Sequence, residues 1–419
     1  MKKSYKKWVE KETGSQLRLV GLKEMVRQEL REFVVSAGMM ALSTLLEDER
    51  TALCGPRYEH QSERSARRAG HVPGELVMGG RRVSVKRPRV RSVEGEEVGL
   101  PSWLQFSVED PLHQRALTQM LVGVSTRKYE RSLEPVDATV KVRGTSKSTV
   151  SRRFIEITEA QMRELFGQDL SKLDLAVVLI DGVHISDHVI IVALGIDTSG
   201  HKHVLGIREG STENATVCTE LIVDLRERGM PTDKTTLFVL DGAKAIRSAV
   251  VEVFGNRARI QRCQVHKARN VHDQLPEYMR ATVAATLWQA YYANNVVHAR
   301  KLLQNLARTL RADHPSAAGS IEEGLEETLT VMAMKLPKNL ERVLSTTNAI
   351  ENLMGSLRNL SHRVKRWRDG TMIVRWTATA VREAATKFRR IAGYQSMPRL
   401  VRVLRAHDVV ALELEEKIA

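Results

Sequence analysis

The sequence predicts an α/β protein whose mixed-sheet core is interrupted by an all-helical insertion and preceded by mainly helical regions. Two patterns carry this prediction: five short apolar runs lie between residues 173 and 262, and helix-period sequence occupies most of the chain on either side. The length of 419 residues is also too great for one compact core, so we expect two to four modules.

The five apolar runs predict the strands of the core. They are Leu175–Ile180, Val189–Ile196, Val204–Ile207, Leu237–Leu240 and Ala258–Ile260. The turn sequence DTSG at residues 197–200 separates the second run from the third and predicts an antiparallel hairpin. Helix-period segments follow the third and fourth runs, which gives the order β-β-β-α-β-α-β. This is the element order of a ribonuclease-H-like core, in which helices cover both faces of a mixed sheet.

Residues 1–105 form the first predicted region, a helical and basic segment expected to bind DNA. Apolar residues recur at helical spacing from Leu22 to Leu46, and Gly55 and Pro56 end that helix. The stretch GELVMGGRRVSVKRPRVRS then predicts a hairpin with two glycines, residues 79 and 80, at its turn. Six cations of this hairpin would lie along a phosphate backbone, and a solvated, positively charged edge strand explains them equally well: Arg81, Arg82, Lys86, Arg87, Arg89 and Arg91.

Residues 106–170 resemble two consecutive helix-turn-helix elements. Gly123 and Gly144 supply the turns, and Ser125 and Ser146 are natural N-caps. The second element presents short hydroxyls and cations at the start of a helix, where a recognition helix meets bases and phosphates. An ordinary capped surface helix is the alternative. The residues that we predict to contact DNA here are Arg127, Lys147, Ser148, Thr149, Ser151 and Arg152.

The core is predicted to be split by the insertion. Its first part covers residues 171–270, and helix-period sequence with a break at Pro315 forms the all-helical insertion at 271–335. The second part of the core, which carries a helix with Glu351, covers 336–395. Residues 396–419 form a short helical tail for which the sequence predicts no function.

The composition favours a nucleic-acid partner. Lysine and arginine number 65 against 50 acidic residues, which gives a net charge of +15 and a pI near 9.8. Cations set against phosphates release counterions, so DNA is the expected partner, although a basic surface that serves only solubility has the same charge. Three widely spaced cysteines argue against a disulfide framework. The sequence shows no secretory signal and no apolar stretch of membrane-spanning length, so we expect a cytoplasmic protein.

Two aspartates follow apolar runs in the same Asp-Gly context. Asp181 follows Ile180 in LAVVLIDGVHI, and Asp241 follows Leu240 in LFVLDGAKA. Neighbouring strands lie about 4.8 Å apart, so carboxylates at matching strand ends can share divalent ions, as two-metal phosphoryl transfer requires. Taken singly, Asp181 would start a turn and Asp241 would N-cap the next helix. The repeated context favours the metal site.

A third carboxylate is expected from a helix beside these strand ends. Glu351 lies in STTNAIENLMGSLRNLSHRVKRW, on a helix predicted to start near Asn348. The spacing Asn-x-x-Glu is also a capping-box pattern, in which Glu351 would bond back to the cap amide. Spacing alone leaves both roles open.

Six motifs keep a fixed order along the chain: LIDGVHI, GIREGSTENA, FVLDGAKA, QRCQVHKARNV, STTNAIENL and VKRWRDGTMIVRW. Together they resemble the Mutator-type transposases of bacterial insertion sequences, and the resemblance covers most of the chain. It implies a ribonuclease-H-like core whose Asp181, Asp241 and Glu351 form an Asp-Asp-Glu triad that holds two Mg²⁺ or Mn²⁺ ions. It also implies a protein of the bacterial cytoplasm and nucleoid, without membrane association. Its partners would be double-stranded DNA, as terminal inverted repeats and target, and further copies in a homodimer or larger assembly.

The motif QRCQVHKARNV contains the pair Cys263-x-x-His266, which has half the ligands of a zinc site. No second pair occurs at suitable spacing, so we do not expect zinc. The family has this signature just past the fifth strand. We therefore predict that it supports the catalytic pocket or contacts DNA near the cut, with a small buried apolar residue as the alternative for the cysteine. The residues in this group are Cys263, His266, Lys267, Arg269 and Asn348.

Cations and aromatic residues follow Glu351 in the sequence. We interpret them as a phosphate grip with packing aromatics, and a solvated helix face is the alternative. The run contains Arg358, Arg363, Lys365, Arg366 and Arg368, with Trp367 and Trp376 interleaved. The predicted DNA contacts among these cations are Arg363, Lys365 and Arg366. His184 and His188 lie close to Asp181 and are expected on an exposed strand face, because magnesium prefers oxygen ligands.

The predicted function is therefore that of a DNA transposase, which binds the terminal inverted repeats of its insertion sequence and carries out metal-dependent cleavage and strand transfer. Two alternatives belong to other classes. One is a catalytically inactive DNA-binding regulator that uses the same basic surfaces. The other is a related ribonuclease-H-fold nuclease, which would cut strands and never join them.

Overall fold

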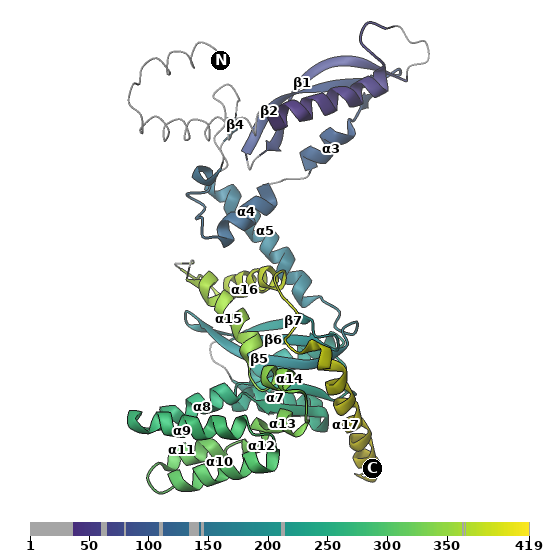
Figure 1. Cartoon of the computed structure of the whole chain (residues 1–419). Helices are drawn as coiled ribbons and strands as arrows, with labels where there is room; N and C mark the ends of the chain where they lie inside the picture. The colour runs from purple at the N-terminus through teal and green to yellow at the C-terminus, as the bar shows by residue number, and fades with distance from the viewer. Residues whose placement is uncertain are drawn as a thin grey trace, which may run out of the picture. The chain divides into compact units, whose positions relative to one another are not determined.

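The structure, a computed structural model, describes residues 37–59, 65–78, 81–108, 112–133, 142–143, 146–210, 214–362, 364 and 366–418 (Figure 1). The chain divides into two compact units, Met1–Ile157 and Thr158–Ala419. The boundary falls inside helix α5 (Lys147–Phe166), and the six-part organisation remains a prediction. The predicted DNA contacts Arg363 and Lys365, and most of the helix predicted from Leu22 onward, lie outside the described residues.

A four-stranded antiparallel sheet organises the first unit. Strands β1 (Ala66–Met78) and β2 (Arg81–Ser92) form a long hairpin, and β3 (Glu97–Val98) and β4 (Val142–Arg143) pair with β2. The predicted hairpin is confirmed by the pairing of Met78 with Arg81, and its two turn glycines lie outside the described residues. A helix over residues 37–54 ends before Gly55, as predicted, and joins α3 (Pro101–Val108) and the hairpin in one apolar core.

The basic strand of this hairpin has partners on both sides only near its ends, where β4 pairs with Arg82 and Val83 and β3 pairs with Val90 and Arg91. Among the described residues, 84–88 pair with β1 alone, so this stretch is an edge. Two of its arginines are neutralised within the unit. Arg87 and Arg89 donate to Glu97 at 2.9 and 3.0 Å, and the Arg87 guanidinium lies 5.4 Å from the centroid of the Trp103 ring. Lys86 is exposed. The phosphate-backbone interpretation of the hairpin therefore stays a prediction for the remaining cations.

Helices and turns make up the described residues from 112 to 133 and from 146 onward in the first unit. Helix α4 (Leu112–Leu121) precedes a turn at Gly123, whose φ is +94°, and Ser146 caps α5 by accepting from the Thr149 N–H at 3.2 Å. Both features were predicted. The helix expected to start at Ser125 is absent from the described residues, where turns and the 3-10 helix η1 (Glu130–Ser132) occupy 126–132. This segment instead buries Tyr129 and Leu133 against α4 and α5, so the first helix-turn-helix prediction is wrong.

The second unit contains the five predicted strands. They are β5 (Leu175–Ile185), β6 (His188–Asp197), β7 (Lys202–Gly210), β8 (Thr236–Leu240) and β9 (Ala258–Arg262). All five are confirmed, and each is longer than its apolar run. The spatial order is β7-β6-β5-β8-β9, with antiparallel pairing among the first three and parallel pairing from β5 to β9. The predicted hairpin at residues 197–200 joins β6 to β7, and Gly200 has a φ of +86° there.

Helices cover both faces of this sheet, as predicted. From Val177 onward, α6 (Ala215–Glu227) and α7 (Lys244–Phe254) pack on one face against the even-numbered residues of β5, such as Ile180. On the other face, helices pack against the odd-numbered residues, such as Leu179 and Val183. These helices are α14 (Lys338–Leu344), α15 (Asn348–Ser361), α16 (Gly370–Ala385) and α17 (Met397–Ile418). Because side chains alternate across a strand, this parity fixes which helices can meet a given side chain of β5.

The segment predicted as a helical insertion consists of helices that share a core of their own (Figure 1). It consists of α8 (Gln264–Asp273), α9 (Glu277–Tyr291), α10 (Val296–Leu310), α11 (Pro315–Glu322), α12 (Leu325–Thr328) and α13 (Thr330–Ala333). Pro315 begins α11, which explains the break seen in the sequence. The insertion starts earlier than residue 271, because Ala268 and Val271 of α8 already belong to its core.

The C-terminal tail is one long helix, α17, rather than a short segment. Leu400 and Leu404 pack into the core beneath the sheet, and Asp408 accepts from the Thr235 N–H at 2.5 Å just before β8. None of the described helices has the length and apolar character needed to cross a bilayer.

Candidate active site

Asp181 lies inside β5 rather than at its end. Its backbone pairs with Val192 of β6, and β5 continues to Ile185, so both the predicted strand end and the alternative turn are wrong. The parallel neighbour β8 stops at Leu240, which is paired with Ile180. Asp181 is therefore the first residue of β5 beyond the end of β8. Its side chain is 7% exposed.

Asp241 follows Leu240 directly and so lies beside Asp181 across the two parallel strands. Its Oδ1 accepts from the Ala243 N–H at 2.9 Å, which makes a tight turn between β8 and α7. The alternative role as N-cap of α7 is wrong, because that position belongs to Ala243. Gly242 completes the turn with a φ of +113°, a conformation that favours glycine.

Glu351 comes from α15, which begins at Asn348 as predicted. Helix α15 packs on the face of the sheet reached by the odd-numbered residues of β5, and Asp181 is one of them. The Thr347 hydroxyl donates to Glu351 Oε1 at 2.9 Å, whereas the Asn348 N–H donates to Thr346 at 3.5 Å. The capping-box alternative for Glu351 is therefore not the arrangement that forms.

The three carboxylates are coupled electrostatically. Burial, together with the charges of Asp241 and Glu351, raises the pKa of Asp181 from 3.8 to about 6 against the opposing effects of His266 and the Gly182 N–H. The Gly182 N–H donates to Asp181 Oδ1 at 2.9 Å. Neighbouring carboxylates repel one another unless a proton or a cation lies between them. Carboxylate oxygens are the ligands that magnesium prefers.

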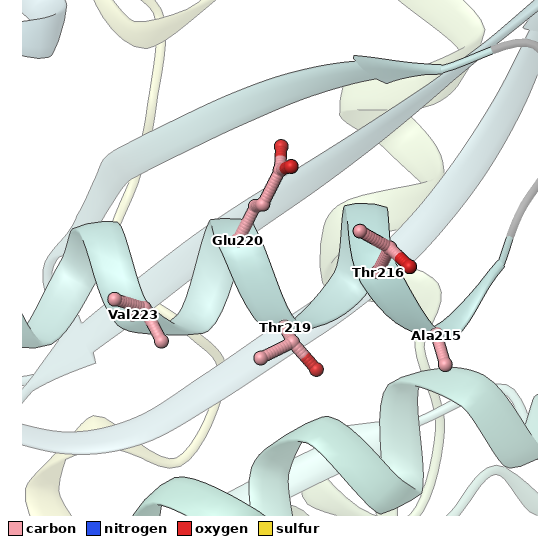
Figure 2. Close-up of a pocket in the computed structure, with 5 residues that line it drawn as sticks. All are labelled: Ala215, Thr216, Thr219, Glu220 and Val223. Atoms are coloured by element: carbon pink, nitrogen blue, oxygen red, sulfur yellow. The ribbon is translucent and has the colours of Figure 1, made fainter.

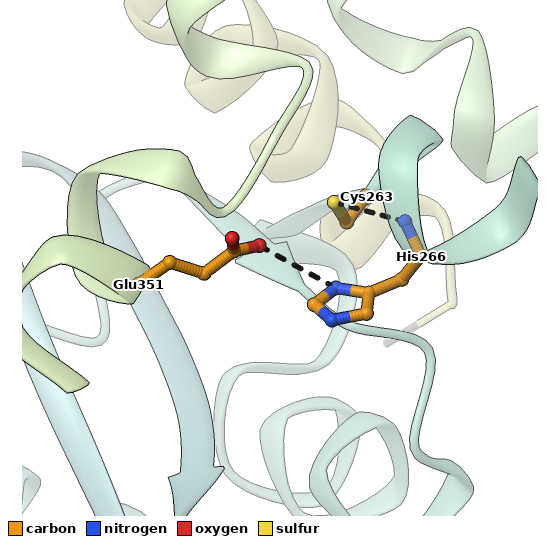
Figure 3. Close-up of side chains that lie close together, drawn as sticks. All are labelled: Cys263, His266 and Glu351. Carbon is orange, nitrogen blue, oxygen red and sulfur yellow. Dashed lines mark hydrogen bonds and ion pairs between the residues drawn. The ribbon is translucent and has the colours of Figure 1, made fainter. Parts of the chain in front are cut away.

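The Cys-x-x-His pair lies at this site. Cys263 is fully buried at the N-cap of α8 and accepts from the His266 N–H at 3.5 Å and from the Thr347 N–H at 3.4 Å. Burial raises the pKa of the Cys263 thiol, but the hydrogen bonds from His266 and Thr347 lower it by more. The hydrogen bond to Cys263 raises the pKa of His266, whose Nδ1 lies 4.0 Å from Glu351 Oε1 (Figure 3). Cys263 is therefore a hydrogen-bonded thiol and not merely a small apolar residue.

Lys267 is held inside the protein by the end of α11. Its side chain is 2% exposed, and Nζ donates to the backbone oxygens of Ser320 and Glu323 at 2.6 and 2.8 Å, at the C-terminal end of α11. Burial, aided by Arg262, lowers the pKa of Lys267 to about 8. A side chain buried in these contacts cannot reach DNA, so the DNA contact predicted for Lys267 is wrong. Arg269, by contrast, is exposed.

Two residues of this region were missed by sequence reasoning. Thr347 is fully buried and connects Cys263, His266 and Glu351 through its hydroxyl. Arg262 ends β9, and its aliphatic part lies against Gly242, beside Asp241, while its guanidinium meets Glu323 and Glu327. Thr347 had a signal, because a threonine immediately before a helix start is a usual cap. Arg262 had none in the sequence.

The other predicted site residues differ from one another in how far they are exposed to solvent. His184 is exposed on β5, as expected, and the half-buried His188 pairs with Glu209 of β7. Arg366 and Asn348 are exposed. The DNA contacts predicted in the first unit are exposed at Arg127, Lys147, Ser148 and Arg152, whereas Thr149 and Ser151 are half-buried and the Thr149 hydroxyl meets that of Ser146.

A shallow pocket of about 400 Å³ lies elsewhere on the second unit (Figure 2). Residues of α6 line it: Ala215, Thr216, Thr219, Glu220 and Val223. Helix α6 covers the face of the sheet opposite to α15. The pocket is therefore separate from the carboxylates.

Comparison with known proteins shows which family this chain resembles. The profile described as Transposase, Mutator family, matches residues 11–390, which include all three carboxylates. The chain belongs to the Mutator family of transposases. The predicted family resemblance is thereby confirmed.

Individual Mutator-family relatives are similar over different lengths. The transposase for insertion sequence element ISRM5 of Rhizobium meliloti is 27% identical over 82% of this chain and 83% of its own length. The transposase for IS1081 of Mycobacterium tuberculosis is 26% identical over 85% of this chain and 86% of its own. The transposase for IST2 of Acidithiobacillus ferrooxidans is 30% identical over 42% of this chain, and the match spans 58% of that relative.

Proposed function

We propose that this protein is a DNA transposase that binds the terminal inverted repeats of its insertion sequence and catalyses metal-dependent DNA cleavage and strand transfer. One observation carries the proposal. Asp181, Asp241 and Glu351 come from two strands and a helix on one face of the sheet, and their charges act together on the pKa of Asp181. Family membership supports the same assignment.

The sheet also supports a ribonuclease-H-like core. Three antiparallel strands are followed by two parallel strands, with helices on both faces, in the chain order β-β-β-α-β-α-β. In this proposal the central strand β5 carries the first carboxylate, its parallel neighbour β8 the second, and a helix after the insertion the third. The insertion then lies in the chain between the second and third catalytic residues.

The donor set fits two Mg²⁺ or Mn²⁺ ions. Magnesium binds carboxylate oxygens, and the pKa of Asp181 is raised first by burial and then by the negative charges of Asp241 and Glu351, which a cation would offset. When bound, two such ions lower the pKa of a coordinated water and stabilise the charge on the attacked phosphate. Asp181, Asp241 and Glu351 would hold them.

The chain's own residues then position the reaction. The strand pairing and the Ala243 N–H hold Asp241, and the Thr347 hydroxyl orients Glu351. Water breaks one phosphodiester bond and leaves a free 3′-hydroxyl. That hydroxyl attacks a phosphate of the target DNA, which forms one new bond and releases one target 3′-hydroxyl, so no covalent protein–DNA link is needed.

The DNA would be held by the basic surfaces of the chain. Net charge, the exposed start of α5 and the cations after Glu351 support double-stranded DNA as partner. Because two transposon ends must be joined in one event, a homodimer or larger assembly on DNA is part of the proposal. So is a site of action at the nucleoid in the bacterial cytoplasm.

The proposal can be tested with labelled terminal-repeat DNA and Mg²⁺. We expect wild type to cut and join the DNA, and Asp181→Ala and Glu351→Gln to bind it without cutting. Glu220→Gln, which changes an exposed carboxylate on α6, is the matched control and should keep both steps. Equal cutting by wild type and both triad variants would refute the triad. Binding without cutting by wild type would favour a regulator, and cutting without joining would favour a nuclease.

A further inference from the structure

Three metal-binding side chains of different chemical type meet beside the carboxylate site. Cys263, His266 and Glu351 each offer a ligand atom, and these atoms lie within 4.8 Å of one another (Figure 3). Among the residues that the structure describes, this is the one group of three cysteine, histidine or acidic side chains with such geometry. Two of the residues come from the end of β9 and the start of α8, and the third comes from α15.

The group has more acceptors than donors. The Thr347 hydroxyl lies 2.9 Å from Glu351 Oε1, 3.2 Å from His266 Nδ1 and 3.3 Å from Cys263 Sγ. A hydroxyl has one proton, so it can serve only one of these three neighbours. Cys263 Sγ also accepts from the backbone N–H groups of His266 and Thr347. The contact between His266 Nδ1 and Glu351 has no such donor and needs either a proton on the imidazole or a metal ion.

The surroundings of the sulfur favour a metal-bound thiolate. Two backbone N–H groups, from His266 and Thr347, point at Cys263 Sγ. Such outer hydrogen bonds orient metal ligands and tune their basicity. The thiol is fully buried, whereas the side chains of His266 and Glu351 are 20% and 32% exposed. An ion can therefore reach the group from the histidine and glutamate side.

We propose that Cys263, His266 and Glu351 bind one Zn²⁺ ion, with water in the fourth position. A thiolate, an imidazole and a carboxylate are zinc ligands, and three protein ligands with an open position are typical of non-structural zinc sites. Mg²⁺ is a poor competitor here because it prefers oxygen ligands. Binding releases the thiol proton of Cys263 to solvent. The sequence lacked a second ligand pair, and Glu351 supplies the missing ligand from a distant part of the chain.

A consequence for activity rests on the proposed function. Glu351 is shared, so a zinc ion bound to Cys263 and His266 would withdraw it from the Mg²⁺ ions of the carboxylate site. Zinc should then inhibit DNA cleavage.

Cobalt titration of the full-length, metal-free protein tests the site without DNA. Co²⁺ bound to a thiolate gives a charge-transfer absorption band, and Zn²⁺ should displace it. We expect one equivalent of Co²⁺ to produce the band in the wild-type protein, and the band should persist when Mg²⁺ is in excess. Cys218→Ser is the matched control, because Cys218 is also buried but lies on α6, and it should behave as wild type.

The ligand variants give the decisive comparison. Cys263→Ser should abolish the band, and Glu351→Gln, which keeps the thiol, should weaken Zn²⁺ binding by at least about tenfold. If Cys263→Ser does not fold, the Zn²⁺ affinity of Glu351→Gln still tests the site. No band in wild type, a band that persists in a folded Cys263→Ser protein, or unchanged Zn²⁺ affinity in Glu351→Gln would overturn the proposal.

Cleavage assays separate this proposal from the proposed function. Zinc should inhibit Mg²⁺-dependent cleavage by wild type and Cys218→Ser, with half-inhibition at the Kd measured by cobalt displacement. Uninhibited cleavage at saturating zinc would refute the sharing of Glu351. A cobalt band without cleavage under any metal would leave the zinc site standing and refute the transposase. Cleavage without a cobalt band would support the transposase and refute the zinc site.

Discussion

Replacement of Asp181 by asparagine should stabilise the metal-free protein above pH 6. The fold holds this carboxyl buried, beside Asp241 and Glu351, and its pKa is raised from 3.8 to about 6. A carboxyl with a raised pKa in the folded state favours folding fully below pH 3.8. That contribution is lost as the pH rises through 6. Asparagine stays neutral, and its amide oxygen can still accept from the Gly182 N–H.

The magnitude follows from the shift in pKa. At pH 8 the ionised Asp181 costs about 3 kcal/mol of unfolding free energy relative to a neutral side chain of the same shape. At about pH 4 the cost falls below ~1 kcal/mol, because the carboxyl is then mostly protonated in the folded state. Mg²⁺ at pH 8 should restore stability to wild type and have a smaller effect on the variant.

Urea unfolding in the presence of a chelator, at both pH values, measures this difference. Asp187→Asn is the control, since Asp187 is an exposed carboxylate at the turn after β5 and should change stability little at either pH. The reasoning is refuted if Asp181→Asn is no more stable than wild type at pH 8. It is also refuted if the two proteins differ equally at both pH values, because the effect would then not come from the ionisation of Asp181.

Three further predictions concern other parts of the chain. Gly324→Ala should lower the unfolding free energy by about 2 kcal/mol, because φ is +65° there and a Cβ would lie 2.8 Å from the Arg262 guanidinium carbon. Its control Gly319→Ala, in open space on α11, should gain up to about 1 kcal/mol, and thermal unfolding that ranks the two alike would contradict the prediction. Asp408→Asn should destabilise the protein by about 2 kcal/mol at neutral pH, because hydrogen bonds from Thr235 and Arg405 outweigh burial and lower the pKa of Asp408. The destabilisation by Asp408→Asn should become smaller as the pH falls below about 4. Urea unfolding that gives the same destabilisation at every pH would contradict this prediction. Arg152→Ala should weaken binding to terminal-repeat DNA and reduce the salt slope by about one, as measured by fluorescence anisotropy. Arg226→Ala, an exposed cation on α6, is its control, and equal effects of the two would remove the start of α5 from the interface.

The sheet was predictable because its strands are buried on both faces. Such strands appear as continuous apolar runs, and Leu175–Ile180 and Leu237–Leu240 are of this kind. The paired carboxylates were predictable for the same reason, since each follows one of these runs.

The position of Asp181 within its strand was not predictable from the same pattern. Beyond Ile180, β5 has no neighbour on the β8 side, and its residues alternate between the buried Val183 and Ile185 and the exposed His184. The apolar run therefore stops where β8 stops, although β5 continues beside β6. In the sequence, this change of pattern within β5 has the same appearance as the end of a strand.

Contacts between distant parts of the chain account for the other differences. Lys267 was predicted near DNA because it follows His266 in a basic motif, but the end of α11 buries it. Thr347 and Cys263 meet only because α15 returns to the sheet after the insertion. Local spacing contains no information about such pairings.

In the proposed function, Asp181, Asp241 and Glu351 hold two divalent ions together. Anomalous diffraction at the manganese edge, from crystals grown with terminal-repeat DNA and Mn²⁺, can locate these ions. Two peaks about 4 Å apart are expected, each in contact with carboxylates of this triad. Manganese found only elsewhere on the protein, or none at Glu351, would contradict this proposal.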